Sequence, residues 1–125
     1  MANSIVLIIG ASIPILWGIA HMFPIKNVVK DFGEISEDNK NILKMEWIME
    51  GLALIFNGLF VLIMTLFVPE QWGASLVYIL SAGMLIVMTI VTLFTGFKVN
   101  FLPYKLCVPI FLTAAILYIL GGFVF

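Results

Sequence analysis

Four long apolar runs limit what this chain can fold into more than any other feature of its sequence. In chain order they are residues 3–23, a run that ends at residue 68, residues 72–97, and the stretch from residue 103 to the C-terminus. An α-helix needs about 20 mostly apolar residues to cross the hydrocarbon core of a bilayer. Each run is about that long, so the sequence predicts four transmembrane helices.

Composition agrees with a membrane environment and leaves no room for a second domain. Of the 125 residues, 63% are hydrophobic and 10% are charged, and the mean hydropathy is +1.21. A soluble domain of this size needs more polar surface. We therefore expect one all-α domain over residues 1–125, an integral membrane four-helix bundle. The first run is not expected to be a cleaved signal peptide, because it lacks a basic start and its apolar stretch is too long.

Several functional classes are disfavoured by residue content. The single cysteine, Cys107, allows neither an internal disulfide nor a CxxC redox pair. The net charge is −1 and arginine is absent, so we expect no nucleic-acid partner and no arginine clamp for phosphate. Walker, nucleophile-elbow and HExxH motifs are also absent from the sequence.

The lysines predict the orientation in the membrane. The two segments that hold them join spans one and two and spans three and four, and the lysines are Lys26, Lys30, Lys40, Lys44, Lys98 and Lys105. The N-terminus and the turn at residues 68–72 hold none. By the positive-inside rule the lysine-bearing side faces the cytoplasm. We therefore expect a multi-pass protein of the cell inner membrane with both termini outside.

The segment between spans one and two has its own helical pattern. Its apolar residues fall on one helical face, and they are Ile25, Val28, Val29 and Phe32. This spacing predicts a short interfacial helix that ends at Gly33. Ser36 is a predicted N-cap, and a helix from there to residue 68 would be about 48 Å long at 1.5 Å per residue. Its first turns must then stand outside the hydrocarbon core.

Polar residues follow one face of each of the first two spans. Glu46, Glu50 and Asn57 share a stripe on the second span, and His21 continues a stripe with Trp17 on the first. The chain returns antiparallel, so His21 and both glutamates should lie at the cytoplasmic end. Ionisable groups in spans normally face the bundle interior. We therefore predict a cytoplasm-facing polar pocket between spans one and two.

Three functions remain open for this pocket. The first is binding or transforming a lipophilic molecule by acid–base chemistry at His21, Glu46 and Glu50. Its ligand-binding residues would be Trp17, Trp47, Asn57, Asn100, Tyr104 and Tyr118. The second is a non-catalytic accessory or structural subunit whose polar stripe joins helices. The third is a metal or haem site, although the spacing is not that of di-iron bundles, and no metal ligands or cofactor are assigned.

Two stretches carry a resemblance to known membrane proteins. The segments "WGIAHMFP" and "DNKNILKMEWIMEGLALIFNGL" resemble small four-span bacterial membrane proteins. In size and helix count the chain is similar to the DoxX-like group. Its His/Glu/Glu set with tryptophans resembles the sterol-isomerase-type EXPERA proteins, which would imply proton shuttling on a bound lipophile by His21, Glu46 and Glu50.

Small residues in the last two spans predict self-association. The third span carries "SAG" at residues 81–83, and the fourth carries "LGG" at residues 120–122. Small residues allow the backbones of neighbouring helices to approach closely. We therefore expect a homo-oligomer, with the lipid bilayer as the other partner.

Overall fold

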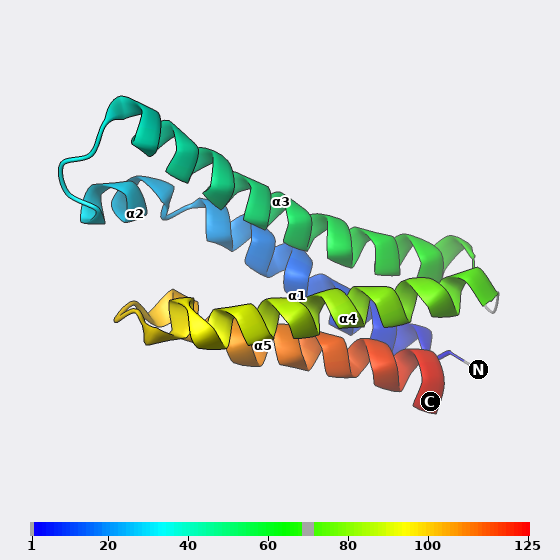
Figure 1. Ribbon diagram of the computed structural model, residues 1–125. Helices are drawn as coiled ribbons and strands as arrows, with labels where there is room; N and C mark the ends of the chain where they lie inside the picture. The colour runs from blue at the N-terminus through cyan, green and yellow to red at the C-terminus, as the bar shows by residue number, and fades with distance from the viewer. Residues whose placement is uncertain (1, 69–71) are drawn as a thin grey trace.

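The computed structural model describes residues 2–68 and 72–125 and is built of helices (Figure 1). In chain order the elements are α1 (Ser4–Met22), α2 (Ile25–Asp31), α3 (Glu37–Phe67), α4 (Trp72–Phe94), the 3-10 turn η1 (Gly96–Lys98), α5 (Leu102–Ile119) and the π-helical turn η2 (Leu120–Val124). Four of these segments are long and apolar enough to cross a membrane. The predicted all-α membrane bundle is confirmed. Most of the predicted turn at residues 68–72 lies outside the described residues.

Local signals fix the ends of the first three helices. At the start of α1, the Val6 N–H donates to the Asn3 side chain at 3.2 Å, and at the start of α3 the Asn39 N–H donates to Ser36 Oγ at 3.2 Å. Between them, α2 ends at Asp31, and Gly33 follows its C-cap with a φ of +76°, a left-handed conformation that glycine adopts easily. The short helix between spans one and two and the Ser36 cap are therefore both confirmed, and the interfacial position of that helix stays a prediction.

The helix α3 is much longer than a membrane span. Its 31 residues extend about 46 Å at 1.5 Å per residue, against a hydrocarbon core of roughly 30 Å. Figure 1 shows its first turns reaching past the other long helices, above α2. The N-terminal part of α3 carries the charged residues of the helix, so this overhang is the part that stands in water or among head groups.

The third and fourth spans differ slightly from the predicted bounds. The α-helix of the third span ends at Phe94, before residue 97, because Thr95 leaves the helical region at φ −125° and ψ −89°. The chain then forms the η1 turn. Pro103 lies inside the first turn of α5, which tolerates proline because the first N–H groups of a helix have no helical partner.

Glycines bring α1 and α3 into backbone contact. A Cβ atom added to Gly18 would lie 2.6 Å from the Gly51 carbonyl oxygen, and one added to Gly51 would lie 2.9 Å from the Gly18 carbonyl oxygen. Gly58 packs in the same way against Ala11 and Ile15. Such approach is possible only without side chains at these positions. The α1–α3 pair is therefore the most closely packed in the bundle.

A second set of close contacts joins α1 to the C-terminal half of α5. Gly10 packs on Leu117 and Tyr118, and Gly121 packs on Leu7. The Asn3 N–H also donates to the Gly121 carbonyl oxygen at 2.6 Å. The glycines of the "LGG" patch thus contact helices of their own chain, while Gly83 of the "SAG" patch has open space around its Cα.

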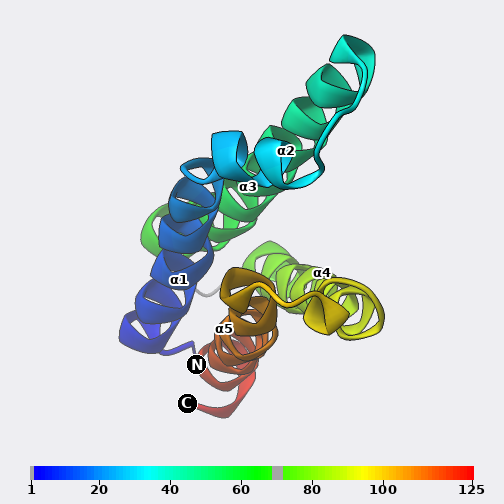
Figure 2. The same cartoon turned by 90° about the vertical axis from the view of Figure 1, so that its left-hand side faces the viewer.

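The bundle consists of two antiparallel helix pairs that meet at one end. Viewed from the end with α2, the α1–α3 pair and the α4–α5 pair lie apart, with α2 lying across the α1–α3 pair (Figure 2). The chain termini lie at the opposite end (Figure 1). All six lysines belong to α2, the start of α3, η1 and the start of α5, so they gather at the end where the pairs separate. We call this the lysine end.

The glycine contact makes a prediction about stability. Gly18→Ala should lower the free energy of unfolding by about 1–3 kcal/mol, because the new methyl group meets backbone atoms that cannot move aside. Gly73→Ala is the matched control: it also lies within a candidate span but meets nothing within 4 Å. It should be neutral or raise stability by up to about 1 kcal/mol through helix propensity. Thermal unfolding in a mild detergent measures both, and equal losses would contradict the packing role of Gly18.

Candidate functional site

The predicted acid–base pair comes together at the lysine end of the α1–α3 contact. His21 Nε2 lies 3.4 Å from Glu50 Oε2, an ion pair when His21 is protonated. The His21 side chain is 6% exposed and that of Glu50 is 39% exposed. Nε2 has no hydrogen-bond partner among the described residues, because the approach of Glu50 lacks hydrogen-bond geometry. A buried polar nitrogen without a hydrogen-bond partner is unusual, so the hydrogen bonding at this position is incomplete.

Trp47 holds the histidine ring in place. The two rings stack with centroids 4.2 Å apart and planes 13° apart, and the Trp47 indole N–H donates to the His21 backbone carbonyl. This carbonyl lies in the last turn of α1, where no further helical N–H is available to it. The Trp47 side chain therefore has two roles: it bonds to a carbonyl group at the end of α1, and it orients the His21 imidazole.

Four adjoining cavities surround this pair, with volumes of about 660, 460, 330 and 200 Å³. Tyr104 lines all four, Glu50 lines two, and Trp47 lines two. The walls come from α1, α2 and α3 on one side and from α4, η1 and α5 on the other. These cavities form one open cleft between the two helix pairs, of the size that small ligands occupy. We call it the Tyr104 cleft.

The cleft lies between the helix pairs and not between spans one and two alone. The sequence suggested a pocket between those two spans, but the glycine contact of Gly18 with Gly51 leaves little space there. Glu50 instead faces the opening toward α4, where Val87, Met88 and Val91 line the opposite wall. The ionisable pair thus sits between spans one and two, and the space beside it opens toward the second helix pair.

The other residues of the predicted site fall into two groups. Glu46 is exposed and lines the cleft beside Glu50, while Asn100 is exposed and lines its outer part with Asp31 and Phe101. Trp17, Trp47 and Tyr104 lie on its inner walls. Asn57 and Tyr118 belong to a separate cluster deeper in the bundle.

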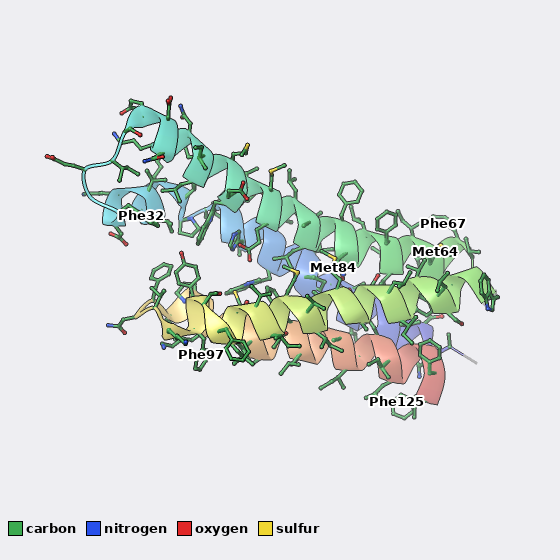
Figure 3. The ribbon with its side chains drawn as sticks, viewed as in Figure 1. Phe32, Met64, Phe67, Met84, Phe97 and Phe125 are labelled. Atoms are coloured by element: carbon green, nitrogen blue, oxygen red, sulfur yellow. The ribbon has the colours of Figure 1, made fainter. Side chains whose placement is uncertain are left out.

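That deeper cluster is a closed hydrogen-bond network that joins three helices. The Tyr118 hydroxyl donates to Asn57 Oδ1 at 3.2 Å, and Asn57 Nδ2 donates to the Ser81 carbonyl at 3.1 Å and to Met84 Sδ at 3.6 Å. Met84 lies midway along α4 (Figure 3). Tyr118 is fully buried and Asn57 is 4% exposed. These hydrogen bonds join α3 to α4 and α5. Both N–H groups of the Asn57 amide are used in them, so none is free to bind a ligand.

Cys107 also lines the cleft, although it was not among the predicted site residues. The Trp17 indole N–H donates to Cys107 Sγ at 3.4 Å, and the thiol donates to the Pro103 carbonyl at 3.3 Å. Cys107 lines two of the four cavities. It lies three residues after Tyr104 on α5, and this helical spacing is the signal that could have placed it on the same face.

The chemistry at the cleft is that of an acid–base pair beside aromatic walls. Within residues 2–68 and 72–125, no group of three His, Cys, Asp or Glu side chains is placed to hold a metal ion. His21 and Glu50 can exchange a proton over 3.4 Å after a small rotation.

No protein-family model matches this chain, and neither a curated protein nor a solved structure matches it. The resemblance to DoxX-like and EXPERA proteins stays a prediction. Function is therefore argued from the geometry of the cleft.

The deeper network predicts a stability effect that a matched pair of substitutions can isolate. Tyr118→Phe should lower the free energy of unfolding by about 1 kcal/mol, because Asn57 Oδ1 loses its hydroxyl partner in a dry core. Tyr104→Phe removes a hydroxyl that bonds to none of the described residues, and it should leave stability nearly unchanged. Thermal unfolding in detergent compares the two, and equal effects would count against the network.

Proposed function

We propose that the protein binds a lipophilic molecule in the Tyr104 cleft, with the polar head of that molecule against Glu50 and His21. The observation that carries this proposal is the juxtaposition of the cleft with a buried, unpartnered imidazole nitrogen and a half-exposed carboxylate. Apolar side chains form most of the remaining wall. A molecule with an apolar tail and one polar group fits such a lining.

Entry from the bilayer follows from where the cleft opens. Its α4 wall consists of Val87, Met88 and Val91, and Val87 and Val91 are also exposed on the outer surface of the bundle. A lipophile can therefore move from the acyl chains to Glu50 without crossing water. Phe32, which follows α2, and Phe97, which lies in η1, are both at the lysine end of the molecule (Figure 3).

Acid–base transformation of the bound molecule is a second role for the same residues. His21 and Glu50 lie close enough to trade a proton, and Glu46 lines the same cavity nearer the rim. The competing role as an accessory or structural subunit is favoured by the Asn57–Tyr118 network, which already serves to join helices. That role explains the deeper network but leaves His21 Nε2 without a function.

We place the protein in the cell inner membrane, with the lysine end in the cytoplasm and both termini outside. The support is the gathering of all six lysines at one end of the bundle. We also propose that copies of the chain associate through α4. Gly83 supports this, because it is a small residue in a span with nothing packed against it.

A cleft-filling substitution tests ligand binding. Ala53 lines the cavity beside Glu50, so Ala53→Phe should displace a bound lipophile and remove most of it from protein purified in mild detergent. Leu52→Phe is the control, since the neighbouring Leu52 is 47% exposed and points away from this wall. Native mass spectrometry measures the bound mass. If wild type carries and binds no lipophile, or if Ala53→Phe retains it in full, the proposal is wrong.

Cysteine labelling tests the orientation. In a Cys107→Ala background, a cysteine placed at Ser4 should react with a membrane-impermeant maleimide added outside intact cells. A cysteine placed at Asn39 should react only after the membrane is opened. Both residues are exposed, so access depends on the side of the membrane alone. Labelling of both from the same side would contradict the four-span topology.

A further inference from the structure

We infer that the head group recognised in the Tyr104 cleft is a cation, a lipophilic ammonium ion that carries N–H groups. This inference rests on the proposed function and adds the chemical class of the ligand. It follows from three properties of the cleft: the sign of its charges, the arrangement of its aromatic rings, and the buried nitrogen behind Glu50.

The wall of the cleft carries carboxylate side chains and no lysine. Asp31 lines the largest cavity, and Glu46 and Glu50 line the cavity next to it. Within the described ranges, none of these three carboxylates forms an ion pair with a lysine; the one such pair joins Glu37 and Lys40. Three carboxylates, of which only Glu50 lies beside a basic side chain, the His21 imidazole, attract a cation to this mostly apolar space and repel an anion.

Two lysines of the same elements make contacts outside the cleft. Lys40 bonds to Glu37 at 2.7 Å, and Lys105 donates to the Phe97 carbonyl at 2.7 Å while lying over the Phe97 ring. None of the lysines lines the four cavities described here. The charged wall of the cleft is therefore left acidic apart from His21.

Aromatic rings surround the acidic space at angles suited to a cation. Tyr104 meets Trp47 edge-on, with centroids 5.7 Å apart and planes 74° apart, and it meets Phe101 with centroids 5.2 Å apart and planes 68° apart. One face of the Trp47 ring is covered by the stacked His21 imidazole. Ring faces attract ammonium groups electrostatically, so a face that these packing contacts leave open adds to the attraction of the carboxylates.

The buried nitrogen of His21 indicates a ligand with N–H bonds. Nε2 lies 3.4 Å from Glu50 Oε2 and has no hydrogen-bond partner among the described residues. In the neutral tautomer that carries its proton on Nδ1, Nε2 accepts a hydrogen bond. The Glu50 side chain is 39% exposed and has room to turn. An ammonium group seated beside it can donate one N–H to the carboxylate and another to Nε2, so that both acceptors are satisfied.

Three amphiphiles of equal chain length separate this inference from simple lipophile binding. The probes are dodecylammonium, dodecanol and dodecanoate, added to the protein in phosphatidylcholine nanodiscs at neutral pH. The readout is the combined emission of Trp17 and Trp47, which both line the cleft, in a Trp72→Phe background, because Trp72 lies at the far end of the bundle and is 82% exposed. Dodecylammonium should bind roughly tenfold or more tightly than dodecanol, and dodecanoate should bind most weakly.

Matched variants assign the preference to Glu50. Glu50→Gln should reduce the binding of dodecylammonium to that of dodecanol in the same variant, because the amide keeps the shape of the side chain and carries no charge. An unchanged thermal unfolding midpoint of the variant shows that the bundle is intact. Glu37→Gln removes an exposed carboxylate outside the cleft and should keep the wild-type order. This control separates the cleft from general attraction of cations to the membrane surface.

Each result decides between the two proposals. Equal binding of all three probes would overturn the cation inference and leave the lipophile cleft standing. Tighter binding of dodecanoate would also overturn it and indicate an anionic head group. A preference for dodecylammonium that persists in Glu50→Gln would overturn the assigned site. If no probe binds and Ala53→Phe has no effect on bound mass, both proposals fail.

Discussion

The backbone contact between α1 and α3 is the interaction on which the rest of this molecule depends. Apolar side chains gain little by leaving lipid for one another, so helices in a membrane associate through close van der Waals packing and hydrogen bonds. Gly18 and Gly51 supply the close packing. The contact fixes the register of the two helices, and this register places His21 against Trp47 and Glu50. A shift of one turn would separate them.

The same physical rule explains why the bundle is closed at one end and open at the other. Near the termini, Gly10 and Gly121 let α1 and the C-terminal turns approach, and the Asn57–Tyr118 bond joins α3 to α5. Toward the lysine end, the one side-chain hydrogen bond between the two helix pairs within the described ranges is the long one from Trp17 to Cys107 Sγ. Larger side chains such as Trp47 and Tyr104 keep the pairs apart there. The cleft therefore begins where small residues no longer allow the two helix pairs to approach each other.

Sequence periodicity predicted the helices well because hydrocarbon imposes length and polarity on each span. It predicted the meeting of His21 with Glu50 for a similar reason: two antiparallel spans joined by a short segment return to the same depth. It did not predict that Tyr118 and Asn57 would bond to each other, or that Cys107 would reach Trp17. Those contacts depend on how the second helix pair rotates against the first, and spacing within one helix carries no information about that rotation.

The polar residues of the spans thus divide by whether their bonds are complete. Asn57 and Tyr118 use each other and their neighbours, so a ligand there would have to break bonds that stabilise the bundle. His21 Nε2 and the Glu50 carboxylate lie beside open space, with a stacked ring and a helix contact holding them. A rigid but unsatisfied pair is what binding needs, because the protein has already ordered its own groups and a ligand adds the missing partner. The Asn57–Tyr118 network therefore stabilises the bundle, and the His21–Glu50 pair is the part that can bind a ligand.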